Sequence, residues 1–165
     1  MDNARERLRF LLETVMLEAQ HLRDTDQRLF AQAFTTERAG TLRSEPLLAE
    51  RLDAFSARFA RLQDTAGDKL LPVLLDSLGE PVGSVLDNLD RAARLGLLVQ
   101  PSEDWLAARA LRNRMVHEYI RNPALLAQAV NEAHRVVPML TSFVDACQAY
   151  VAARHLLPPG PAEEA

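Results

Sequence analysis

The sequence has little cysteine, few aromatic residues and almost no lysine. Its single cysteine, Cys147, cannot form an internal disulfide, and its place in an apolar helical pattern predicts a small buried side chain. Aromatic residues make up only 5% of the chain, so the core must be built from leucine, alanine and valine. Lys69 is the only lysine among 19 basic residues. Because all the others are arginine, one arginine taken alone says little about function.

Long apolar runs are also missing. The longest are short pieces such as 70–75 and 95–99, well under the roughly 20 residues that cross a bilayer as a helix. The N-terminus lacks the pattern of a signal peptide. Together with the lone cysteine, these features predict a soluble protein of the reducing cytoplasm with no membrane partner.

The overall charge is mildly acidic. A net charge of −4 argues against a surface that coats nucleic acid as a whole, so any nucleic-acid site must be local. The 165 residues, 48% of them hydrophobic and 25% charged, fit one globular domain. We expect a single helical domain over residues 1–157 and a disordered tail over residues 158–165.

Apolar residues recur at helical spacing through the first half of the chain. One amphipathic helix is expected from Asn3 to about Phe34, unless residues 24–26 interrupt it, and the polar stretch 35–44 is expected to be a connection. A second helix should start at Pro46 and kink between Gly67 and Pro72. The buried stripes expected for these helices include Leu8, Leu11, Leu12, Val15, Ala19, Leu22, Leu29, Phe30, Ala33, Leu48, Leu52, Phe55, Phe59, Leu62 and Ala66.

The second half contains three further helix patterns. A capping box over 84–87 starts the third, with Val85, Leu86, Leu89 and Ala93 on its apolar face, and Gly96 stops it. The fourth starts at Ser102 and should end within a few residues of Tyr119, because Asn122-Pro123 both stops one helix and starts the next. In the fifth helix, Pro138 predicts a bend. Five amphipathic helices joined by short turns predict an all-α fold, an antiparallel bundle.

The fourth helix carries the most informative stretch of the chain, Leu111–Tyr119. It contains an arginine, four residues, a histidine, one residue and a tyrosine, in a chain with only four histidines and two tyrosines. On a helical wheel Arg112 falls inside the apolar stripe, where a guanidinium is costly unless it meets an anion or a wet cleft. The alternative is that Arg112 extends to the surface or pairs with a carboxylate of a neighbouring helix.

The imidazole of His117 could be held in one orientation by a neighbouring side chain. Asn113 and His117 lie one turn apart on an adjacent ridge, so the amide could hold the imidazole in one orientation. His117 also falls in the predicted last turn, where the helix dipole favours the protonated ring. Taken alone, such a histidine would be an ordinary surface or core residue.

The local charge is opposite to that of the whole chain. Between residues 109 and 121, four arginines face only one acid, Glu118, a local balance of +3. This pattern predicts a focused anion site, although a charged run can be merely a solvated helix face. Histidine as acid or base, with arginine for the charge that develops on phosphorus, suits metal-independent cleavage of RNA through its own 2′-hydroxyl. The arginines are Arg109, Arg112, Arg114 and Arg121.

The sequence lacks the motifs of other common catalytic and metal sites. The sequence has no glycine-rich phosphate loop, no cysteine and histidine spacing for a metal, and no nucleophile-elbow pattern, so we expect no metal or cofactor.

On a straight helix Arg112 and His117 diverge by about 140° and lie about 7.5 Å apart along the axis. They could converge on one phosphate across a two-fold axis, so the sequence predicts a homodimer with this helix at the interface.

The pattern Arg112-Asn113-x-x-x-His117-x-Tyr119 resembles the Arg-x4-His-x-Tyr signature of HEPN-domain proteins, specifically the HepT-like toxins. The resemblance rests on these few positions and on the helical layout. It implies a helical dimer that acts as a metal-independent endoribonuclease and is paired with a minimal nucleotidyltransferase (MNT) antitoxin.

The resemblance also implies roles for single residues. Arg112 and His117 would act in RNA cleavage, Asn113 would support them, and Tyr119 would receive AMP from the antitoxin, which adds negative charge and repels RNA. Arg109, Arg114 and Arg121 would bind the RNA. Some relatives are thought to be non-catalytic nucleotidyltransferase-binding subunits, which is the alternative function. A third interpretation is a helical scaffold, in which Arg112 pairs with a structural carboxylate and His117 lies away from any cleft.

Overall fold

The chain folds into an antiparallel bundle of helices. The computed structural model describes residues 2–118 and 122–158, and this part of the chain contains helices and no strands. The all-α bundle predicted from the sequence is therefore confirmed. The elements in chain order are α1 (Asp2–Leu29), α2 (Thr36–Gly40), α3 (Pro46–Asp64), the π-helical turn η1 (Thr65–Leu70), α4 (Leu71–Ser77), α5 (Val85–Arg94), α6 (Ser102–Glu118) and α7 (Pro123–Ala153).

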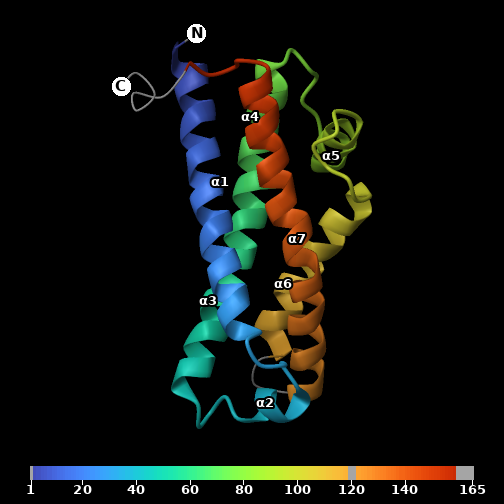
Figure 1. Cartoon of the computed structure of the whole chain (residues 1–165). Coiled ribbons are helices and arrows are strands. Elements are labelled where there is room, and N and C mark those ends of the chain that lie inside the picture. The colour runs from blue at the N-terminus through green and yellow to red at the C-terminus, as the bar shows by residue number, and fades with distance from the viewer. Residues whose placement is uncertain (1, 119–121, 159–165) are drawn as a thin grey trace, which may run out of the picture.

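Three helical segments run along the length of the molecule. They are α1, the continuous segment from α3 through η1 to α4, and α7 (Figure 1). α6 packs against α3 and α7, while α5 lies to one side against α4 and α6. The short α2 packs on α7 at the end of the bundle where α1 ends and α3 begins. The five predicted helices correspond to these three segments, α5 and α6, and α2 lies in the stretch that was expected to be a connection.

Several helix ends lie where the sequence places them. Pro46 opens α3, and the capping box of α5 is present in both directions between Ser84 and Asp87. Gly96 adopts a φ of +78° just after α5, a conformation that glycine takes without steric cost. The Asn122 side chain accepts hydrogen bonds from the first backbone N–H groups of α7. These ends are set by local chemistry, which is why the sequence reveals them.

The end of α1 differs from the prediction. The helix stops at Leu29 instead of continuing to Phe34, and Ala33 is exposed. The Arg38 guanidinium, from α2, donates to the carbonyls of Leu29 and Gln32 at 2.7 Å each. The Arg38 side chain thus satisfies the carbonyl of Leu29, which the helix leaves unpaired at its end, and the carbonyl of Gln32 in the connection that follows.

Residues 24–26 do not interrupt α1, although their composition allowed it. Thr25 is buried, and its hydroxyl donates to the carbonyl of His21 one turn earlier. Asp26 lies 2.7 Å from Nδ1 of His134 in α7, and that ring stacks on Phe30 with 3.8 Å between the centroids. Contacts with α7 therefore stabilise the helix through a segment that would otherwise favour a turn.

The buried face of α5 is rotated from the predicted one. Leu89 and Ala92 are buried, whereas Leu86 is 43% exposed and Ala93 is exposed. Asn88 turns inward because its amide accepts from the backbone N–H of Gly83 and donates to the carbonyl of the same residue. This polar anchor selects the face of α5 that packs on the bundle.

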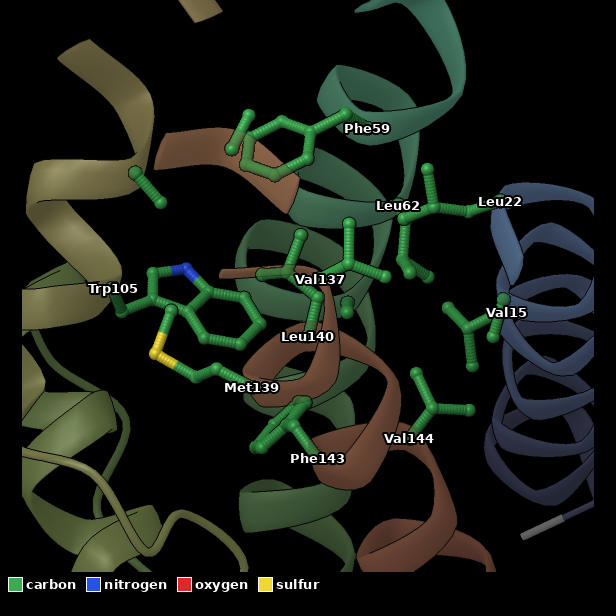
Figure 2. Close-up of a cluster of buried hydrophobic side chains, with 14 of the residues drawn as sticks. Val15, Leu22, Phe59, Leu62, Trp105, Val137, Met139, Leu140, Phe143 and Val144 are labelled. Carbon is green, nitrogen blue, oxygen red and sulfur yellow. The ribbon is translucent and has the colours of Figure 1, made fainter. Parts of the chain in front are cut away.

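The core is built mostly from aliphatic side chains around one tryptophan. Trp105 of α6 is fully buried, and its ring meets Phe143 of α7 edge to face, with 5.0 Å between the centroids. Figure 2 shows this ring beside Met139 and Phe143, with side chains of α1 and α3 completing the cluster. Burying such large apolar surfaces is the main force that holds α6 in place.

The predicted kink between Gly67 and Pro72 is a π-helical turn against this tryptophan. η1 carries Gly67, whose missing Cβ leaves room for the Trp105 indole. One turn earlier, the buried Gln63 donates from Nε2 to the Trp105 carbonyl at 2.9 Å. α3 and η1 therefore pack closely against the first part of α6. The residues that resemble the HEPN signature follow later in the chain.

Gly67→Ala is expected to destabilise the fold. A Cβ at this position would lie 2.9 Å from Nε1 and 3.1 Å from Cζ2 of Trp105, a rigid buried ring that cannot move away. The clash costs about 1–3 kcal/mol and outweighs the gain of about 1 kcal/mol in helix propensity. Thermal unfolding followed by circular dichroism measures the difference. Gly40→Ala is the control, because nothing lies within 4 Å of its added Cβ, and equal melting temperatures for the two variants would contradict this account.

Glu18 of α1 faces η1 in a partly buried position. Thr65 donates to its Oε1 at 3.3 Å, whereas Oε2 is buried without a partner among the described residues. Burial raises the pKa of Glu18 above its ordinary value of 4.5, and the Thr65 hydrogen bond and the charges of Arg61 and Lys69 offset only part of the rise. The ionised carboxylate is therefore a cost to the fold.

Glu18→Gln is expected to raise stability at neutral pH. A group with a raised pKa favours the folded state below its unfolded value of about 4.5 and loses that contribution as pH rises through the folded value. The amide keeps the acceptor for Thr65 and carries no charge, so the gain should appear at pH 7 and vanish near pH 4. Urea unfolding at both pH values tests this, with the exposed Glu13→Gln as control. A gain of the same size at pH 4 would show that burial of charge is not the cause.

α7 combines core contacts with high apolar content. Cys147 is fully buried on it, as predicted, and burial raises the pKa of this thiol to about 12. Although it contains no long uninterrupted apolar run, α7 with its 31 residues is long and apolar enough, by length and composition alone, to cross a bilayer. Core helices of water-soluble proteins meet them too, and α7 packs against α1, α2 and α6.

Candidate functional site

α6 is anchored to the bundle along one face. Its first turn is tied to α5, since the Ser102 hydroxyl donates to Asp90 at 2.7 Å. Trp105, Ala108 and Met115 are buried against the bundle. Near the other end of the helix, Met115 Sδ accepts from the Ser56 hydroxyl of α3 at 3.8 Å. The arginines of α6 are thus held on a helix with a fixed position.

Arg112 lies at the edge of the buried face and pairs with a carboxylate. Its Nη1 donates to Oδ2 of Asp64, at the end of α3, at 2.8 Å. The side chains are 38% and 45% exposed, so water reaches both of them. This contact is the carboxylate pairing that the sequence left open as an alternative. Ion pairs at such exposure contribute about 0–1 kcal/mol, so the pair does not lock the arginine in place.

The two neighbouring arginines are paired as well. Arg109 donates to Asp68 of η1, and Arg114 donates to Glu132 of α7. The hydrogen bond from Arg114 lowers the pKa of Glu132, with a smaller contribution from the charge of Arg114. Each of the three arginines of α6 thus has one carboxylate partner from another element. The local excess of positive charge seen along the sequence is largely neutralised in space.

Several predicted site residues are only partly covered by the structure. Asn113 is described and exposed. His117 lies in the last turn of α6, but its side chain, and the whole of Tyr119 and Arg121, lie outside the described residues. The predicted contact between Asn113 and His117 and the roles of Tyr119 and Arg121 therefore stay predictions.

A cleft adjoins the site between α6 and α7. It has a volume of about 390 Å³, and apolar side chains that include Leu111, Val136 and Met139 line it. Arg114 and Glu132, which form an ion pair, line it as well. Within the described ranges, no three histidine, cysteine or acidic side chains come together as a possible metal site.

The acidic partners of the three arginines were not among the residues predicted from the sequence. Asp64 and Asp68 lie four residues apart, and Arg109 and Arg112 lie three residues apart, which places each pair on one face of its helix. This spacing was visible in the sequence, but pairing the two faces requires knowing that α3 and α6 are neighbours. Glu132 gave no comparable indication, because Arg135, three residues later on the same helix, was an equally suitable partner by its spacing.

Comparison of the chain with protein-family models, with curated proteins and with solved structures gave no match. Function must therefore be argued from the residues and their geometry.

Proposed function

We propose that this protein is a HepT-like toxin of the HEPN class, a cytoplasmic metal-independent endoribonuclease that works as a homodimer. The observation that carries the proposal is the sequence order Arg112, Asn113, His117, Tyr119. The first three residues belong to α6, and Tyr119 directly follows its last residue, Glu118. The accessibility of Arg112 supports it, because a guanidinium that is 38% exposed can exchange Asp64 for a phosphate. We further propose that an MNT-type antitoxin neutralises the protein by AMP transfer to Tyr119.

The chemistry needs one imidazole and one guanidinium at the same phosphate. His117 takes the proton of the RNA 2′-hydroxyl while that oxygen attacks phosphorus, and the bond from phosphorus to the 5′-oxygen breaks as that oxygen is protonated. Arg112 stabilises the extra negative charge on the phosphoryl oxygens. Since the two residues diverge on one helix by about 140°, each site takes its arginine from one copy and its histidine from the other. Asn113 orients the imidazole, and Arg109, Arg114 and Arg121 bind the RNA backbone.

The experiment is an RNA cleavage assay in the presence of EDTA. We expect the purified protein to cut single-stranded RNA and His117→Ala to cut it at least about 100-fold more slowly. Unchanged cleavage by this variant would assign the activity to a contaminant or to other residues. Cleavage that EDTA abolishes would contradict the metal-independent chemistry.

A second function is favoured by the three ion pairs of α6. Arginines that are already neutralised by Asp64, Asp68 and Glu132 suit a protein that presents a structured helix to a partner without cutting RNA. The corresponding function is a non-catalytic subunit that binds a nucleotidyltransferase. It predicts no RNA cleavage and a stable complex, visible by size-exclusion chromatography, with a small nucleotidyltransferase encoded in the neighbouring reading frame.

A further inference from the structure

Two adjoining cavities open where α1 ends and α3 begins. Their volumes are about 370 Å³ and about 310 Å³, and they share Leu47 and Arg51 of α3. Four arginines line them against two glutamates, Glu45 and Glu50. We call this surface the arginine groove, and its arginines are Arg28, Arg38, Arg51 and Arg58.

The groove is built from one face of α3, the last turns of α1, and α2. Leu47, Arg51, Ala54 and Arg58 follow one another at spacings of three and four residues, so they share one side of α3. Arg28 comes from the last turn of α1, and Arg38 comes from α2. The four arginines therefore come from three helices to line the two adjoining cavities.

Neutral acceptors orient two of these guanidiniums. Arg58 donates to the His21 carbonyl at 3.2 Å and to the Thr25 hydroxyl, while Arg38 donates to the two carbonyls at the end of α1. Such acceptors hold a guanidinium in place but do not cancel its charge. Among the described residues, none of the four groove arginines forms an ion pair with a carboxylate.

The groove differs in this respect from α6, where each of three arginines has a carboxylate partner. Burial and then the nearby charge of Arg51 lower the pKa of Arg38, so the like charges of Arg38 and Arg51 lie close to each other in the groove. An anion in the groove would relieve this repulsion and bind several guanidiniums at once.

The groove lies at the end of the bundle that also holds α2 and the C-terminal part of α6 (Figure 1). On α3, Ser56 contacts Met115 of α6, and Arg58 follows two residues later, about 200° around the helix. Arg112 pairs with Asp64, six residues beyond Arg58 on α3, so Arg112 and the groove lie on different sides of α3 and are offset along it by about 9 Å or more. A strand of several nucleotides, rather than a single one, is needed to reach both.

We propose that the arginine groove binds the phosphate backbone of single-stranded RNA at a distance from the cleavage site. This inference rests on the proposed ribonuclease function, since it names the surface that holds the substrate beyond the bond that is cut. The groove supplies backbone contacts without base readout, so binding is insensitive to sequence and sensitive to salt.

The test compares two double variants in a His117→Ala background, which prevents cleavage during binding. Arg28→Gln with Arg51→Gln removes the two groove arginines for which no side-chain hydrogen bond is described. Arg5→Gln with Arg94→Gln is the control, because both are exposed arginines outside the groove and the change in net charge is the same. The probe is a fluorescent 20-nucleotide single-stranded RNA followed by anisotropy, with AMP and inorganic phosphate as competitors, and melting temperatures check folding.

The groove variant should bind the RNA at least tenfold more weakly than the control, and the slope of log affinity against log salt should fall by about 1.4, or about 0.7 per lost phosphate contact. Equal affinity of the two double variants for the RNA would overturn the proposal. That result is expected if the groove binds only an acidic protein partner, because the groove substitutions would then leave RNA binding unchanged. Competition by AMP or phosphate as strong as that by RNA would overturn it in favour of a mononucleotide site. Weakened binding in the groove variant, with no cleavage by the protein that retains His117, would support the groove and overturn only the ribonuclease function.

Discussion

Arg112→Ala is expected to lower the rate constant of RNA cleavage by about 100-fold or more, because it removes the cation that stabilises charge in the transition state. The loss should appear in kcat, since a group that acts on developing charge contributes little to binding of the ground state. Stability should hardly change, because the pair with Asp64 is partly exposed and contributes about 0–1 kcal/mol. Single-turnover cleavage of a defined RNA in EDTA measures the effect.

Asp64→Asn separates this role from a structural one. It removes the partner charge and leaves the Arg112 guanidinium in place, so a catalytic arginine should keep its activity or gain some. If Arg112 has only a structural role, both substitutions do no more than break this ion pair, and neither should affect cleavage. Equal effects of Arg112→Ala and Asp64→Asn on stability, with neither affecting cleavage, would contradict the catalytic assignment and support the scaffold interpretation.

Trp105→Ala is expected to produce the largest loss of folding stability. The ring is fully buried between α3, η1 and α7, and removing a buried aromatic side chain costs about 3–5 kcal/mol. For a chain of this size, the melting temperature should fall by roughly 10 °C. Differential scanning calorimetry or circular dichroism measures the change.

Phe10→Ala is the matched control for this prediction. Phe10 is also aromatic but is 66% exposed on α1, so its truncation should change the free energy of unfolding by less than about 0.5 kcal/mol. A comparable loss in both variants would mean that Trp105 is not the residue around which α6 is positioned. Because α6 carries Arg112, Trp105→Ala should also weaken cleavage below its own unfolding temperature.

The parts of the fold that local chemistry determines could be predicted from the sequence. The start of α3 at Pro46, the capping box of α5, the turn at Gly96 and the break at Asn122 all follow from residues within a few positions of each feature. The burial of Cys147 followed from helical periodicity in the same way. Such features are visible because the interacting groups are close together in the chain.

Features that depend on distant contacts could not be predicted. The end of α1 depends on Arg38, and its continuity through Asp26 depends on His134 of α7. The π-helical turn requires Gly67 to face Trp105, 38 positions later in the sequence. The sequence indicated a kink from glycine and proline but could not show what the kink fits against.

The candidate site, too, has some features that can be predicted from the sequence and others that only the folded chain shows. The sequence order of Arg112, Asn113, His117 and Tyr119 could be read directly, and so could the local excess of arginine. The carboxylates that neutralise Arg109, Arg112 and Arg114 come from three different elements and appear only in the folded chain. Among the described residues, the arginine groove holds four arginines that form no ion pair, and no linear motif in the sequence marks this groove.

The central claim is that one copy supplies Arg112 and the other supplies His117 to a shared site. Mixing inactive Arg112→Ala and His117→Ala proteins, with subunit exchange confirmed by native mass spectrometry, tests it most directly. Half of the dimers would then be mixed, and each would hold one intact site, so cleavage in EDTA should recover to about a quarter of the wild-type rate. Exchange without any recovery of cleavage would contradict the account.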